Sequence, residues 1–150
     1  MDAPAPDLAH SDCTCFQARR LARLLTQHYD RAFAPLGLNV NRYSILRHAE
    51  AGQTITRLAA RLGMERSTLS RDLRPLLEAG WLELQREADG RSRQVRLTPS
   101  GRALLRRGAA CWRNAQSALA AGLGQDATRA LNASLAGAAG TVARLPQDRP

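Results

Sequence analysis

The stretch Thr56–Leu77 constrains the fold of this chain most, because its apolar residues recur with a helical period on both sides of a glycine. Before Gly63, the apolar positions predict a helix over about 56–62, with Thr56 as its N-cap. After Gly63, four leucines fall on one stripe of a second helix, over about 65–79: Leu69, Leu73, Leu76 and Leu77. The stretch therefore predicts a helix-turn-helix whose second helix turns its leucines toward the core.

The opposite face of that second helix is basic and hydroxylated. Arginine can bind guanine O6 and N7, or a phosphate, through two parallel hydrogen bonds, and Ser and Thr can bond bases or phosphates. We therefore expect this face to enter the major groove of DNA. Taken by itself, the pattern of this helix is explained equally well by a polar face that is simply exposed to water. The residues concerned are Arg66, Ser67, Thr68, Ser70, Arg71 and Arg74, of which Thr68 borders the buried face.

The residues after Gly80 predict a β-hairpin. Apolar and polar residues alternate in 81–87 and again in 93–98, on either side of the turn dipeptide Asp89-Gly90. A helix-turn-helix followed directly by a hairpin is a winged helix, in which the wing arginines lie toward the minor groove. We assign Arg86, Arg91 and Arg93 to the wing, with Asp89 shaping the turn or orienting Arg91.

The run from Ser67 to Gly101 resembles the MarR (multiple antibiotic resistance regulator) family of winged-helix transcription factors. The resemblance is carried by the Gly-Trp-Leu turn into the wing, the Asp-x-Arg wing tip, and Leu97-Thr98-x-x-Gly101 after it, and it extends over about 15–145. It implies an obligate homodimer that binds a pseudo-palindromic operator. Such proteins usually repress transcription, and they release DNA when a small molecule or an oxidant arrives.

Long helices are expected on both sides of the winged helix. An apolar stripe predicts a helix over 13–34, and Thr98-Pro99 begins a helix that ends near 122. A last helix over about 126–145 is expected to bury Leu131, Leu135, Ala138, Val142 and Leu145. In the family that the chain resembles, these helices form the dimer interface. The expected fold is mainly α with a small β-wing (α+β). It is a single domain over 13–150 after a flexible tail at 1–12, with the winged helix at about 41–98 and dimerisation helices at about 13–34 and 99–145.

The net charge of +9, carried by arginine with no lysine, makes nucleic acid the leading partner class. Between 64 and 96, however, seven arginines face six acids, so DNA binding is argued from where the arginines lie more than from total charge. No stretch is apolar for long enough to span a bilayer, and the N-terminus lacks a signal-peptide pattern. We therefore expect a cytoplasmic protein with no membrane partner.

No constellation of catalytic residues is evident, and Cys-x-Cys by itself is a weak metal signal. We expect no enzyme activity, no catalytic residue, no metal and no cofactor. Two other interpretations stay open: a thiol-based redox enzyme using Cys13 and Cys15, and a basic protein that binds nucleic acid without regard to sequence.

The cysteines also suggest regulation by oxidation. Cys15 lies in the first turn of the first predicted helix, where a thiolate is favoured, and Cys13 or Cys111 would capture its oxidised sulfur in a disulfide. In the organic-hydroperoxide-sensing branch of the MarR family, a reactive cysteine occupies the position of Cys15. Tyr29 matches one of two tyrosines that bond it, whereas Val40 stands in place of the other. The alternative is that all of these residues simply pack.

For a small-molecule inducer, the resemblance implies a crevice between the wing domain and the dimerisation helices. Tyr43, Arg47 and Trp112 are the candidates to line it. The alternative is that the two aromatic residues belong to the core, which is the commoner place for an aromatic residue in a helix.

Overall fold

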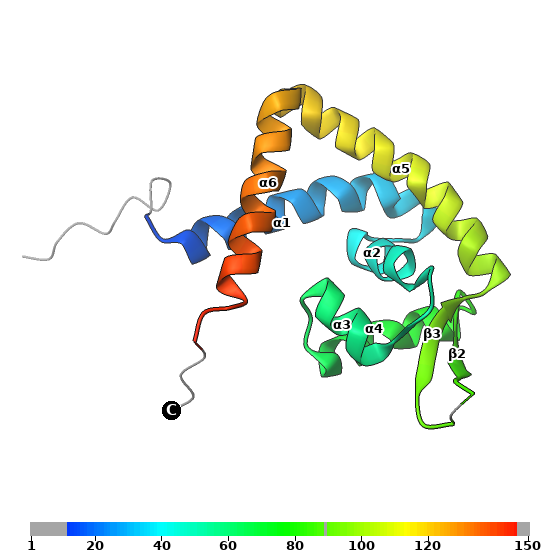
Figure 1. Cartoon of the computed structure of the whole chain (residues 1–150). Helices are drawn as coiled ribbons and strands as arrows, with labels where there is room; N and C mark the ends of the chain where they lie inside the picture. Colours follow the sequence, from blue (N-terminus) through cyan, green and yellow to red (C-terminus); the bar gives the residue numbers. More distant parts are fainter. Residues whose placement is uncertain (1–11, 89, 147–150) are drawn as a thin grey trace, which may run out of the picture. The chain divides into compact units, whose positions relative to one another are not determined.

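The computed structural model describes residues 12–88 and 90–146, which form helices and one small sheet (Figure 1). The predicted mainly helical fold with a β-wing is confirmed. The chain divides into two compact units, Met1–Trp112 and Arg113–Pro150, with the boundary inside a helix. Apart from Asp12, the tail predicted at 1–12 lies outside the described residues. The elements are α1 (Thr14–Phe33), η2 (Ala34–Leu36), α2 (Val40–Ala49), β1 (Gln53–Thr54), α3 (Ile55–Leu62), α4 (Arg66–Glu78), β2 (Leu82–Arg86), β3 (Arg93–Leu97), α5 (Pro99–Leu123) and α6 (Gln125–Val142).

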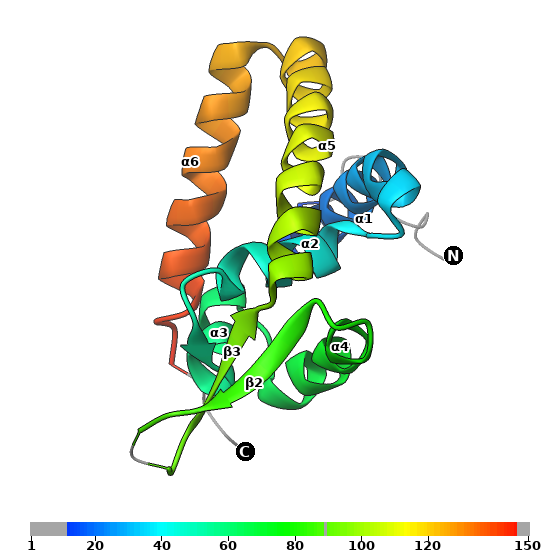
Figure 2. The same cartoon turned by 90° about the vertical axis from the view of Figure 1, so that its right-hand side faces the viewer.

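The sheet is antiparallel, with the strand order β1-β3-β2. β2 and β3 form the predicted hairpin, in which Leu82 faces Leu97 and Arg86 faces Arg93. β1 pairs only with Val95 and Gln94, on the other edge of β3. The outer part of the hairpin is therefore two-stranded, and Figure 2 shows it extending beyond α3 and α4.

The leucine stripe of α4 anchors the helix-turn-helix. Leu69, Leu73 and Leu76 are buried and Leu77 is half-buried, as the periodicity predicts. Each fully buried leucine contributes about 1.5–3 kcal/mol relative to an exposed one. The same core takes in fully buried side chains from the other elements of the first unit: Phe33, Ile45, Leu46, Leu58, Val95 and Leu97.

The prediction of Thr56 as the N-cap of α3 is wrong. Thr54 is the cap, because its extended backbone ends β1 and its hydroxyl oxygen accepts a hydrogen bond from the backbone N–H of Arg57 at 3.3 Å. Pairing of β1 with β3 therefore decides which threonine begins the helix. Gly63, with a φ of 64°, ends α3 in the left-handed conformation that glycine adopts without strain.

Polar contacts at the first turn of α2 connect three helices. The Asn39 side chain caps α2 by accepting from Arg42 N at 2.8 Å, and the Asp30 carboxylate of α1 accepts from Val40 N at 2.7 Å. Both satisfy N–H groups that a helix start leaves without a partner. On the other side, Asn41 Nδ2 donates to Asp72 Oδ2 of α4 at 2.9 Å.

The base of the wing is tied to the start of α5. Thr98 caps α5, as predicted, by accepting from Gly101 N at 3.1 Å, and its hydroxyl also donates to the carbonyl of Gly80 at 2.6 Å. The carbonyl of Trp81 accepts from Thr98 N at 3.1 Å. Gly101 lies so close to this carbonyl that a Cβ there would overlap its oxygen.

The second unit contains the end of α5 and all of α6, joined at Gly124. Within it Thr128 is buried and donates its hydroxyl to the carbonyl of Gly124 at 2.8 Å. The expected burial of Leu135, Val142 and Leu145 is wrong for the single chain, since they are 42%, 59% and 55% exposed. Two helices cover only one side of each other, so an apolar face of α6 is left in water.

We predict that Gly101→Ala destabilises the protein by an amount at the upper end of about 1–3 kcal/mol, because the added methyl overlaps a backbone oxygen that cannot move alone. Gly122→Ala, in the same helix, is the matched control. It meets nothing within 4 Å and replaces a poor helix former, so it should stabilise by up to about 1 kcal/mol. Urea unfolding measures both, and equal stability of the two variants would contradict the close contact.

Candidate nucleic-acid interface

The exposed face of α4 holds the side chains that the sequence assigned to DNA. Arg66, Arg71 and Arg74 are exposed, and none of them forms an ion pair with a described residue. Ser67 and Ser70 are exposed and Thr68 is half-buried, as its place beside the leucine stripe implies. Ser70 Oγ donates to the carbonyl of Arg66 at 2.9 Å, so its oxygen remains able to accept.

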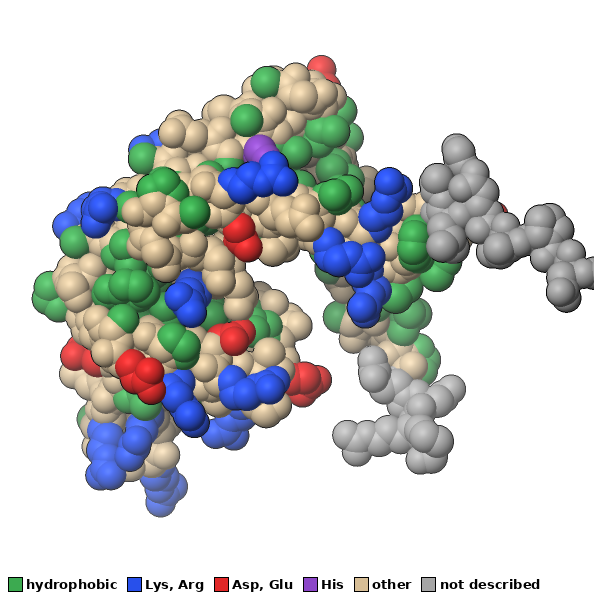
Figure 3. All heavy atoms as spheres, turned by 180° about the vertical axis from the view of Figure 1, so that it is seen from behind, with side chains coloured by type: hydrophobic (Ala, Val, Ile, Leu, Met, Phe, Trp, Pro, Cys, Tyr) green, Lys and Arg blue, Asp and Glu red, His purple; other side chains and the backbone are tan. Residues whose placement is uncertain are grey.

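The wing carries the second group of arginines. Arg86, Arg91 and Arg93 are exposed, and Figure 3 shows arginine side chains gathered at the tip of the hairpin. Arg86 and Arg93 face each other across β2 and β3, an arrangement in which like charges repel. The prediction for Asp89 falls outside the described residues.

Sequence reasoning missed a polar face of the wing. Glu87, Gln94 and Arg96 are joined by hydrogen bonds on it and line a hollow of about 510 Å³ together with Gln85, Arg86 and Ala88. The alternation of a strand places Gln94 and Arg96 on one face, so the signal was present in the sequence.

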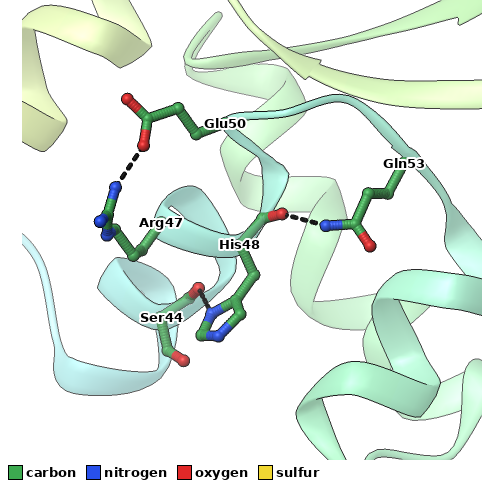
Figure 4. A network of polar contacts seen from close by, with 5 residues as sticks. All are labelled: Ser44, Arg47, His48, Glu50 and Gln53. Carbon is green, nitrogen blue, oxygen red and sulfur yellow. Dashed lines mark hydrogen bonds and ion pairs between the residues drawn. The ribbon is translucent and has the colours of Figure 1, made fainter.

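A second polar cluster, also not predicted, surrounds the end of α2 (Figure 4). His48 Nδ1 donates to the carbonyl of Ser44 at 2.8 Å, and Gln53 of β1 donates to the carbonyl of His48 at 2.6 Å. Arg47 forms an ion pair with Glu50. The bond from Gln53 connects β1 with the end of α2. A hollow of about 480 Å³ beside them is lined by Arg47, His48, Glu50, Ala51 and Arg61.

Comparisons with known proteins identify this architecture. Residues 43–101 match the family model of a winged helix DNA-binding domain. The structure of the Mycobacterium tuberculosis transcriptional regulator MosR in complex with DNA is 38% identical, covers 89% of this chain and 100% of that chain, and has a TM-score of 0.76. The chain belongs to the MarR family of transcriptional regulators.

Two other MarR-family structures have the same fold. The transcriptional repressor CouR bound to a 23-mer DNA duplex is 25% identical, covers 93% of this chain and 99% of that chain, and has a TM-score of 0.81. MarR from Escherichia coli, at 20% identity, covers 91% of this chain and 100% of its own with a TM-score of 0.70, and shows the fold alone. None of the curated proteins compared with this chain matches it.

The residues assigned to the MarR-type ligand crevice differ in their surroundings. Tyr43 is only 8% exposed and stacks on Phe33, with ring centroids 4.6 Å apart. Gly108 of α5 lies against the same ring, where a Cβ would come within 2.8 Å. Arg47 and Trp112 are exposed, and the hollow that takes in Arg47 includes neither aromatic residue. Tyr43 is thus a packing residue in the single chain.

The three cysteines differ in their surroundings. Cys13 and Cys15 are exposed at the start of α1, while Cys111 is half-buried against the core of the first unit. Cys15 and Tyr29 lie fourteen residues apart on one continuous helix, about 21 Å along its axis, so they do not meet within one chain. Burial raises the pKa of the Tyr29 phenol above its ordinary value.

Among residues 12–88 and 90–146, no group of three or more His, Cys, Asp or Glu side chains is placed to hold a metal ion. No helix in this part of the chain combines the length and the apolar character needed to cross a membrane.

We predict that Arg93→Thr stabilises the DNA-free protein by about 0.2–1 kcal/mol at low salt, because it removes a like charge directly opposite Arg86. The same change should weaken DNA binding. Thermal unfolding at two ionic strengths checks the first effect, which salt should screen. A variant that is less stable than the wild type at low salt would show that the two arginines do not repel.

Proposed function

We propose that this protein is a homodimeric transcriptional repressor that binds a pseudo-palindromic DNA operator and releases it in response to a chemical signal. The observation that carries the proposal is the face of α4, where three arginines without ion pairs among the described residues stand on a helix anchored by buried leucines. The DNA-bound structures of MosR and CouR support it. The protein acts by binding in the cytoplasm, and the proposal requires no catalytic step.

The proposed reading surface has three parts. α4 enters the major groove and the wing reaches toward the minor groove. α3 crosses the backbone, where its exposed Arg57 and Arg61 contact phosphates. The residues of α4 are Arg66, Ser67, Thr68, Ser70, Arg71 and Arg74, and those of the wing are Arg86, Arg91 and Arg93, with Asp89 at the turn.

Exposed apolar side chains support dimerisation. Leu24 of α1 is 53% exposed, and Leu135 and Val142 leave an apolar face on α6. Burying such side chains is favourable by about 25 cal/mol per Å² of apolar surface, which supports their role in dimerisation. Two copies related by a two-fold axis would present two α4 helices about 34 Å apart, one turn of DNA.

We predict that Arg71→Ala weakens operator binding by about 1–3 kcal/mol, since a bidentate base contact is lost. Fluorescence anisotropy with a duplex from the upstream region of the protein's own gene, against a scrambled duplex, measures the effect. Arg129→Ala, in the second unit, removes the same charge outside the reading surface and is the control. Wild-type affinity in Arg71→Ala at moderate salt would refute the placement of α4. Equal binding of both duplexes by the wild type would favour a sequence-blind basic protein.

The chemical signal is a small molecule or an oxidant, and the exposed cysteines favour the oxidant. An organic hydroperoxide would oxidise the Cys15 thiolate to a sulfenic acid and leave as the alcohol. A thiolate from Cys13 or Cys111 would then attack that sulfur, and a disulfide forms as water is released. Exposure of Cys13 and Cys15 at a helix N-terminus supports this route over a purely packing role.

We predict that organic hydroperoxide releases the wild-type protein from its operator, that dithiothreitol restores binding, and that Cys15→Ser stays bound. The same anisotropy assay measures all three. Release of Cys15→Ser by the oxidant would contradict the role of this thiol. A wild type that ignores oxidant would leave a small-molecule inducer as the signal, and catalytic turnover of the hydroperoxide would instead favour a thiol enzyme.

A further inference from the structure

We propose that Glu87 is the positioning residue of the wing, which holds Arg86 and Arg93 in the arrangement that meets DNA. The inference rests on the proposed function, because it concerns how the wing binds. No other acid of the hairpin among the described residues combines backbone and side-chain bonds of this kind.

Glu87 bonds across the end of the hairpin with its backbone and its side chain. Its N–H donates to the carbonyl of Ser92 at 3.0 Å, and its carbonyl accepts from Gly90 N at 2.9 Å. One carboxylate oxygen accepts from Ser92 Oγ and the other from Gln94 Nε2. Glu87 thus closes the loop between the two strands.

The residues that Glu87 holds are the two neighbours of Arg93. Ser92 and Gln94 stand on either side of it in the sequence, and Arg86 directly precedes Glu87. Because side chains alternate along a strand, Gln94 points to the face opposite Arg93, and Arg86 shares the face of Arg93 as its partner in the register. Glu87 therefore bonds to the backbone and side chains of the residues next to both arginines.

The two-stranded outer part of the hairpin needs the stabilisation that these bonds give. β1 pairs with β3 only as far as Gln94, so the part of the hairpin nearer the tip has two strands. An isolated two-stranded hairpin is marginally stable in water. The facing arginines add repulsion at the same place.

The contacts of Glu87 continue into the body of the domain. Gln94 Oε1 accepts from Arg96 Nη2 at 2.8 Å. Both side chains lie against Gly52, in the turn before β1, where a Cβ would come within 3.1 Å of Gln94 and 3.2 Å of Arg96. The bonds that begin at Glu87 thus reach the segment between α2 and β1.

A role through charge and a role through position predict opposite changes in DNA affinity when the Glu87 side chain is removed. If only charge mattered, removing an acid near phosphates would tighten DNA binding. If position matters, binding weakens. Glu83 is the matched control, since it is an exposed acid four residues earlier, on β2, whose side chain forms no ion pair or hydrogen bond among the described residues.

The test compares operator affinity, by anisotropy, of the full-length wild type with Glu87→Ala, Glu87→Gln and Glu83→Ala. We expect Glu87→Ala to weaken binding by about fivefold to tenfold. Glu87→Gln, which keeps an acceptor oxygen, should lose less, and Glu83→Ala should bind as well as or better than the wild type. The loss in Glu87→Ala should disappear when Arg86 and Arg93 are both replaced by alanine.

Two affinity results would overturn the proposal. One is that Glu87→Ala binds as tightly as Glu83→Ala. The other is that its loss persists in full without Arg86 and Arg93, which would indicate a general loss of folding. Amide hydrogen exchange gives a readout without DNA: exchange at positions 87 and 90 should accelerate in Glu87→Ala and not in Glu83→Ala. If the wild type does not prefer its operator, the proposed function fails, and unchanged exchange would separately refute the role of Glu87.

Discussion

The winged helix depends on one close approach of two backbones, where Gly101 of α5 lies against the carbonyl of Trp81. Around this contact, the first residues of α5 satisfy the carbonyls that follow α4: Thr98 and Ser100 donate their hydroxyls to Gly80 O, and Thr98 N donates to Trp81 O. Together with the close contact at Gly101, these bonds join the end of α4, the base of the wing and the start of α5. The two sequence motifs of the MarR resemblance that flank the wing are the two sides of this junction.

A second junction is polar and lies at the start of α2. The N–H groups there are satisfied from two directions, by Asn39 within the turn and by Asp30 from α1, while Asn41 extends to Asp72 of α4. A carboxylate at a helix N-terminus gains from the helix dipole as well as from the hydrogen bond. Of these bonds, the one between Asn41 and Asp72 reaches α4, which its buried leucines hold against the core.

The sequence predicted the elements whose signal is local. The leucine period of α4, the alternation in the hairpin and the Thr98-Pro99 start of α5 all lie within one element and appear where expected. The cap of α3 failed because Thr54 and Thr56 are equally able to cap, and pairing between β1 and β3 decides between them. The Asp30 and Asn41 contacts span 10 and 31 residues, so no period reveals them. The apolar stripe of α6 is visible in the sequence, but the surface that covers it lies outside α5 and α6.

The near balance of charge between 64 and 96 conceals an unbalanced surface. Asp72 accepts from the amide of Asn41, and Glu87 accepts from the hydroxyl of Ser92 and the amide of Gln94. Meanwhile Arg66, Arg71 and Arg74 form no ion pair with any residue that the structure describes. An arginine paired with its own carboxylate would have to break that pair before it could bind a phosphate, whereas these three are held ready by the leucines beneath them. Counting charges therefore understates what the face of α4 offers to DNA, because two of the acids in this stretch, Asp72 and Glu87, bond to groups of the fold itself.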